Sequence, residues 1–228
     1  IALILAFMAS GALGIATEWL LIRHLYRRPL DTLLATWGLS LVLQQVYRSA
    51  FGQREVGVSL PDWMMGSLPL TDMIEVPFNG LVVMTLTLII AVTVAFMMYR
   101  SGWGLRVRAV VLNREMAGAV GIDTGRTDRL TFGVGCGIAG VAGAAFTMIG
   151  STGPTAGQLY IVDTFLVVVF GGAASLLGTI ASAFSISQVQ SILEFFLSGS
   201  MAKVITLLTV VGILMLRPQG LFAVKVRK

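Results

Sequence analysis

Long runs of apolar residues are the feature that most constrains this chain. A transmembrane helix needs about 20 mainly apolar residues, and suitable runs recur throughout the sequence. They cover residues 1–22, 32–47, 79–99, 130–150, 160–197 and 201–216. Only 12% of the residues are charged, against about 25% in a soluble domain. We therefore predict an all-α fold, a polytopic transmembrane helix bundle that forms a single domain over residues 1–228.

The charged residues indicate how this bundle is oriented. Of the 16 Lys and Arg residues, 13 fall in residues 23–28, 100–129 and 217–228, whereas residues 49–78 carry four acidic residues against Arg54 alone. Lys and Arg concentrate in cytoplasmic loops. We therefore expect the three basic segments, and with them the carboxyl terminus, on the cytoplasmic side of a multi-pass protein. No basic stripe with interleaved aromatic residues suggests nucleic-acid binding.

The apolar run over residues 160–197 is long enough for two short crossings. An odd number of crossings must join the outer end near Gly150 to the basic segment at Arg217. Three crossings result if the Gly-rich residues 171–178 make a tight cytoplasmic turn. A pair of re-entrant half-helices is the alternative, because irregular backbone at membrane depth is tolerated where protein or water covers it. Both interpretations, two spans or broken helices, remain open at this point.

Polar side chains recur along one face of one predicted helix and are frequent in a second. In residues 32–47 they are spaced three or four apart, which places them on one side of a helix. Such a stripe faces other helices or water rather than lipid. Hydrogen bonding between helices and the lining of a solute path are equally open explanations. The residues predicted to line such a path are Thr36, Ser40, Gln44, Tyr47, Ser185 and Gln188.

The run over residues 130–150 is rich in glycine, with five glycines between residues 133 and 143. Small residues spaced four apart, such as Gly133 and Gly137, allow two helix backbones to approach closely in lipid. We expect this helix to pack tightly against another. Among the ionisable residues within or near the spans, Glu18 precedes Arg23 by five positions, and we expect the two to pair near the cytoplasmic interface.

Enzymatic motifs are absent from the sequence. It contains no Cys and His cluster suited to a metal, no nucleophile elbow and no GxxxxGK[ST] phosphate loop. We therefore predict no catalytic residues, no metal and no cofactor, and expect any ATP hydrolysis to occur on another subunit. An intramembrane enzyme is disfavoured because no paired catalytic residues occur.

The basic segment over residues 100–129, called the basic loop below, combines apolar and charged residues. Its middle, residues 104–121, alternates Val with Arg and is predicted to form one short amphipathic helix. Gly121 is the expected stop signal, because Gly favours the left-handed conformation that follows a helix. A helix lying on the inner leaflet explains the arginines, since membrane lipid attracts basic amphipathic helices.

The basic loop also resembles a known motif. Glu115-Met116-Ala117 followed by Gly121 is similar to the Glu-Ala-Ala…Gly loop of ABC importer permeases, with Met in place of the first Ala. The whole chain resembles the branched-chain amino-acid permease family, and most closely its urea-transport members. The runs that carry the resemblance are RHLYRRPLDTLLATWGLSLVLQQ, RAVVLNREMAGAVGI, GQLYIVDTFLVVVFGG and RPQGLF.

This resemblance implies a permease subunit of an ABC importer in the bacterial inner membrane. The expected solute is urea, which hydroxyls and amides satisfy without a charged site; a branched-chain or other amino acid of the same family is the alternative, as is a self-contained channel or secondary carrier. The implied partners are ATP-binding subunits, a second permease subunit and a periplasmic solute-binding protein. Because the chain starts within an apolar run, we expect the family's amino-terminal helices to be missing. The residues implied to couple with the ATPase are Arg106, Arg108, Asn113, Arg114, Glu115, Ala117 and Gly121.

Overall fold

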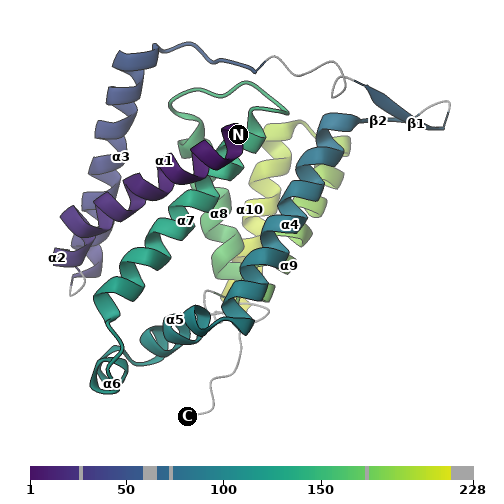
Figure 1. Ribbon diagram of the computed structural model, residues 1–228. Helices are drawn as coiled ribbons and strands as arrows, with labels where there is room; N and C mark the ends of the chain where they lie inside the picture. The colour runs from purple at the N-terminus through teal and green to yellow at the C-terminus, as the bar shows by residue number, and fades with distance from the viewer. Residues whose placement is uncertain (26–27, 59–65, 72–73, 173–174, 217–228) are drawn as a thin grey trace. The chain divides into compact units, whose positions relative to one another are not determined.

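The computed structural model (Figure 1) describes residues 1–25, 28–58, 66–71, 74–172 and 175–216. The chain divides into two compact units, Ile1–Pro154 and Thr155–Lys228. The described residues are almost entirely helical, which confirms the all-α prediction. A two-stranded antiparallel hairpin, β1 (Ser67–Thr71) and β2 (Ile74–Pro77), is the one element that the periodicity did not suggest within these described ranges.

The first unit contains the amino-terminal helix, a second long helix, and the two long helices between which the basic loop lies in the sequence. Its helices are α1 (Ala2–Thr17), the π-helical turn η1 (Glu18–Ile22), α2 (Arg23–Leu25), α3 (Pro29–Phe51), α4 (Phe78–Arg100), α5 (Gly102–Leu112), α6 (Arg114–Ala119) and α7 (Thr124–Phe146). The second unit contains α8 (Ala156–Gly171), α9 (Leu176–Phe196) and α10 (Gly199–Leu216).

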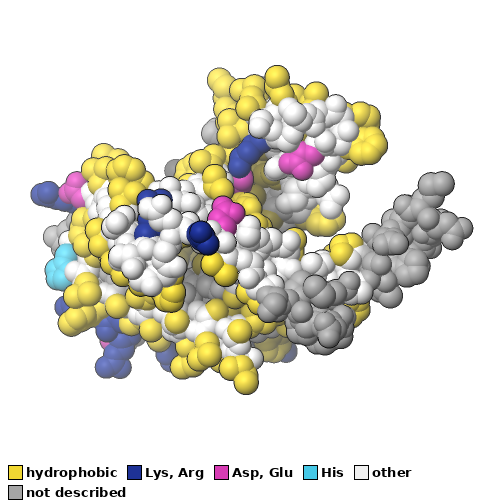
Figure 2. Space-filling view, turned by 90° about the horizontal axis from the view of Figure 1, so that it is seen from above, with side chains coloured by type: hydrophobic (Ala, Val, Ile, Leu, Met, Phe, Trp, Pro, Cys, Tyr) yellow, Lys and Arg dark blue, Asp and Glu magenta, His cyan; other side chains and the backbone are white. Residues whose placement is uncertain are grey.

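Four stretches of helix are long and apolar enough to cross a membrane, counted over the described residues. They are Ala2–Leu25, Phe78–Arg100, Thr124–Phe146 and Leu176–Phe196. Helix α3 has 23 residues, but its polar residues lower its hydropathy. Helices α8 and α10 are apolar and shorter. Many large hydrophobic side chains are exposed, as expected where lipid replaces water. Figure 2 shows hydrophobic side chains at several places on the face seen from above.

Helices α1 and α7 pack against each other in antiparallel fashion, and glycines make their contact close. A Cβ at Gly140 would lie 2.8 Å from the carbonyl oxygen of Ala6, and one at Gly14 would lie 2.6 Å from the Cβ of Cys136. Side chains therefore do not fit between the two backbones at these points. Figure 1 shows the pair side by side. The predicted packing is confirmed for Gly133 and Gly137, where a Cβ would lie 2.5 Å from Ile15 and 2.7 Å from Phe7, whereas at Gly135 and Gly143 a Cβ would meet no described atom within 4 Å.

The described basic segments lie at one of the two ends of the first unit. At one end the Asn79 side-chain amide donates to the carbonyl of Met148 at 3.1 Å, and Val56 forms a β-bridge with Thr152. At the opposite end lie η1, α2, α5, α6 and the start of α7 (Figure 1). The described parts of the basic segments 23–28 and 100–129 thus share one end, as the charge pattern predicts. The third basic segment, residues 217–228, lies outside the described residues.

The second unit divides the run over residues 160–197 into two helices. Helix α8 ends at Gly171, Gly172 has a φ of 87°, and the Ser175 hydroxyl accepts a hydrogen bond from the Gly178 backbone N–H at 3.0 Å. The buried Ser182 hydroxyl donates to the carbonyl of Val167 at 2.7 Å, so α8 and α9 form an antiparallel pair. Helix α9 is long enough to cross a membrane alone.

Candidate functional site

The basic loop folds into two short helices. Asn113, with φ −155° and ψ 102°, ends α5 and begins α6, and its side-chain oxygen accepts a hydrogen bond from the Met116 N–H at 3.0 Å. The prediction of one helix over residues 104–121 was therefore wrong. A capping Asn satisfies a helix N-terminus better than it continues a helix. Ser101 caps α5 in the same manner, through the Gly104 N–H at 3.1 Å.

Gly121 ends the second of these helices in the left-handed conformation predicted for it, with φ 89°. The Ile122 N–H donates to the carbonyl of Ala117 and the Gly121 N–H to that of Gly118, both at 3.0 Å. These two bonds form a Schellman-type end, which satisfies carbonyls that the helix terminus leaves unpaired. The backbone then turns toward Asp123, the N-cap of α7.

Helix α5 packs against the end of α4. Val107 and Val110 are buried. The Arg108 guanidinium lies 5.6 Å from the centre of the Tyr99 ring, and its Nε donates to the carbonyl of Gly104 at 3.3 Å. Arg106 is exposed. Arg108 is exposed too, and it also contributes to the structure of the loop through these two contacts.

Helix α6 has a buried side and an exposed apolar side. Ala117 is only 5% exposed, which seats α6 against its neighbours. Met116 and Val120 are 63% and 77% exposed, and Glu115 is exposed beside them. Met116 and Val120 are four residues apart and therefore neighbours on the surface, and exposed apolar side chains that adjoin each other often mark an interaction site. The arrangement is suited to docking against another surface.

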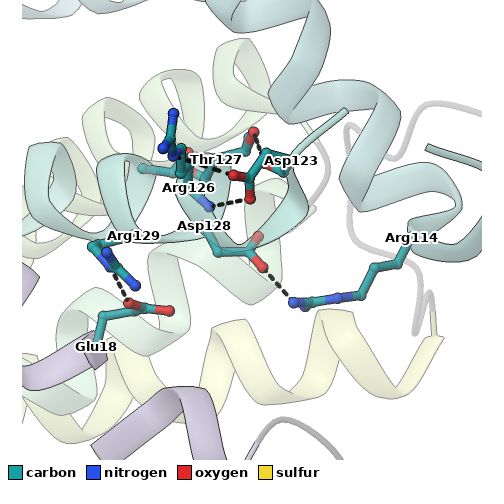
Figure 3. A network of polar contacts seen from close by, with 8 residues as sticks. Glu18, Arg114, Asp123, Arg126, Thr127, Asp128 and Arg129 are labelled. Carbon is teal, nitrogen blue, oxygen red and sulfur yellow. Dashed lines mark hydrogen bonds and ion pairs between the residues drawn. The ribbon is translucent and has the colours of Figure 1, made fainter. Parts of the chain in front are cut away.

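A network of charges joins α6 to the membrane-spanning helices (Figure 3). Arg114 Nη2 lies 2.8 Å from Asp128 Oδ2 on α7. The next residue, Arg129, donates from Nε to Glu18 Oε2 of η1 at 3.1 Å. The side chain of Glu18 is 1% exposed. Its ion pair is thus with a residue of α7, 111 positions away, and the expected pairing with Arg23 was wrong because the packing of α7 on η1 supplies a nearer cation.

Sequence analysis did not single out Asp128 and Arg129. Two adjacent charges in the first turns of an otherwise apolar helix were the signal that could have found them. Asp123, which the same segment contains, has a local role: its Oδ1 accepts the Arg126 backbone N–H at 3.0 Å, and its Oδ2 lies 3.2 Å from Arg126 Nε.

The residues predicted to line a solute path occur in both units. On α3, the hydroxyls of Thr36 and Ser40 donate to carbonyls of their own helix, at 2.9 Å and 2.7 Å. Both residues are half-buried, as is Gln44, whereas Tyr47 is exposed. On α9, Ser185 donates to its own helix at 2.8 Å, and Gln188 is exposed. The lining of a path stays a prediction.

A family model matches most of the chain. The model described as "Branched-chain amino acid transport system / permease component" covers residues 1–214. No solved structure matches the chain significantly.

Curated relatives give the same picture. The chain is 23% identical to "Probable branched-chain amino acid transport permease protein LivH" of Methanocaldococcus jannaschii, an alignment that covers 97% of this chain and 74% of that protein. It is 27% identical to "High-affinity branched-chain amino acid transport system permease protein LivH" of Salmonella typhimurium and of Escherichia coli, with 94% of this chain and 72% of each relative covered.

Proposed function

Because the chain belongs to the family of branched-chain amino acid transport system permease components, we propose that it forms part of the membrane path for a branched-chain or similar apolar amino acid. ATP-binding subunits supply the energy, and a solute-binding protein and a second permease subunit complete the importer. The match of the family model over residues 1–214 is the observation that carries this proposal. The chain itself is a transport subunit of the membrane.

An amino acid replaces urea as the favoured solute. The relatives reported above are named for branched-chain amino acids, and none of these names refers to urea. The expectation of urea was based on the resemblance to urea-transport permeases and on the fit of hydroxyls and amides to an uncharged solute. In the second unit, Asp163 and Lys203 lie 2.9 Å apart and form an ion pair with each other.

The exposed side of α6 is the surface that we assign to the ATP-binding subunit. Met116 and Val120 supply apolar area, and Glu115 supplies a charge at the edge. Burial of apolar side chains ringed by polar ones is the usual composition of an interface centre and its rim. Asn113 and Gly121 fix the two ends of α6 and so present this side as one rigid piece.

Reconstitution tests the proposal. The permease is purified with its native ATP-binding, second permease and solute-binding subunits and placed in vesicles, and uptake of radiolabelled leucine and urea is measured with and without ATP. We expect ATP-dependent leucine uptake and co-purification of the ATP-binding subunit. Uptake of urea without leucine would reassign the solute, and uptake without any ATPase would favour a self-contained carrier.

Two variants of α3 extend the same assay to the proposed path. Gln44→Leu removes the amide from the half-buried polar stripe, whereas Gln45→Leu changes the same side chain at an exposed position one residue further on. If the stripe lines the path, the first substitution lowers leucine uptake and the second does not. Equal uptake by both variants would assign the stripe to helix packing.

A further inference from the structure

Two adjacent residues of α7 connect it to two different elements. Asp128 pairs with Arg114 of α6 at 2.8 Å, and Arg129 pairs with Glu18 of η1 at 3.1 Å (Figure 3). Because these residues are neighbours on one rigid helix, a displacement of one pair moves the other. The chain of contacts runs from the exposed helix of the basic loop to the end of the amino-terminal transmembrane helix.

The inner pair of this chain is the more constrained. The Glu18 side chain is 1% exposed and Arg129 is 32% exposed. A charge buried to that degree requires its partner, because an uncompensated charge in an apolar environment is strongly disfavoured. Separation of Arg129 from Glu18 is therefore disfavoured when α7 moves.

The element that carries Glu18 differs from an ordinary helix. Residues Glu18–Ile22 form a π-helical turn between α1 and α2. Such turns interrupt the regular hydrogen-bond ladder and often occur at functional sites. A helix at a π-helical turn changes direction at a lower cost than within a regular segment. The ion pair thus pulls on α1 at the point where its geometry is least regular.

The surrounding packing leaves room for such a displacement. An open groove of about 460 Å³ lies between η1, α5 and α7, and Ile22, Val107, Val111 and Asp128 are among the residues that line it. The ion pairs on α7 provide a direct connection between the basic loop and η1 beside this groove.

We propose that Arg114–Asp128 and Arg129–Glu18 form a relay that transmits the movement of α6 to the packed pair α1 and α7. Asp128 is its central positioning residue. This inference rests on the proposed function, because it assigns to the relay the step between ATP hydrolysis on a partner and movement of the membrane helices. The relay needs no contact with the solute.

The uptake of solute per ATP hydrolysed tests the relay. In the reconstituted importer, Asp128→Asn breaks the outer pair and keeps the shape of the side chain. Its matched control is Asp123→Asn, which neutralises an Asp in the same segment that pairs locally with Arg126. We expect Asp128→Asn to bind the ATP-binding subunit and hydrolyse ATP, but to lower leucine uptake per ATP about fivefold or more, the usual lower bound of allosteric coupling.

Reversal of the pair separates a relay from a merely local effect. Arg114→Asp combined with Asp128→Arg restores the attraction with opposite sign, and we expect it to recover uptake per ATP relative to Asp128→Asn. Glu18→Gln, which breaks the inner pair, is expected to uncouple in the same manner. Unchanged uptake per ATP in both Asp128→Asn and Glu18→Gln would overturn the relay. Failure of the unaltered permease to bind any ATP-binding subunit would instead overturn the proposed function.

Discussion

Gly121 holds a backbone conformation that other residues adopt at a cost. At φ 89°, a side chain with a Cβ is strained by about 1–2 kcal/mol, and a β-branched residue is especially disfavoured there. The strain falls on the two hydrogen bonds that close α6, so the exposed side of that helix loses its fixed orientation. Glycine is thus required at position 121 for its left-handed backbone conformation. It is not required to make room, because a Cβ would meet no described atom within 4 Å.

We expect Gly121→Val to lower partner-stimulated ATP hydrolysis and leucine uptake more than Glu115→Gln, because loss of an exposed charge costs less than about 1 kcal/mol. Gly102→Val is the matched control and should leave both activities unchanged. It lies in the basic loop but outside α6, has no positive φ, and has open space around the position of a Cβ as far as the structure describes its neighbours. Full coupled transport by Gly121→Val would show that the turn is not required.

Among the helices, the contact of α1 with α7 depends on missing side chains. We expect Gly140→Ala to lower the melting temperature of the purified subunit, because the new methyl group would lie 2.8 Å from a backbone carbonyl oxygen of α1. Neither backbone can shift without disturbing its own helix, and overpacking costs about 1–3 kcal/mol.

Gly143 provides the comparison for this measurement. It lies on the same helix three residues later, and a Cβ added there would meet no described atom within 4 Å. Gly143→Ala should leave the melting temperature unchanged or raise it slightly, since Ala is favoured over Gly in a helix by about 1 kcal/mol. Equal melting temperatures for the two variants would contradict the close packing of α1 on α7.

The elements that local patterns specify were predictable from the sequence. Apolar run lengths and the glycine at 121 depend on neighbours in the chain, so they indicated the spans and the end of α6. The pair of Arg114 with Asp128, and that of Glu18 with Arg129, depends on which helices meet in space. No periodicity encodes that, and the composition around Glu18 does not distinguish a π-helical turn from a regular helix.

Across the whole chain, the distribution of charge predicts which end faces the cytoplasm. After replacement of the native Cys136 by Ala, single cysteines are introduced at Gly57 and Gly118, both of which are exposed. An impermeant maleimide should label the first in intact cells and the second only after the membrane is opened. Labelling of the Gly118 position from outside would invert the orientation.

Helix α7 is held at both of its ends. Asp128 and Arg129 form ion pairs in its first turns. Just past its last turn, the carbonyl of Met148 accepts a hydrogen bond from the side-chain amide of Asn79. Its 23 residues extend over about 35 Å without a break. Such a helix is a rigid connection between the basic loop and the opposite end of the first unit. Because one regular helix joins the two places, a displacement of α6 that moves the first turns of α7 also moves the segment just past its last turn, where Thr152 forms a β-bridge with Val56.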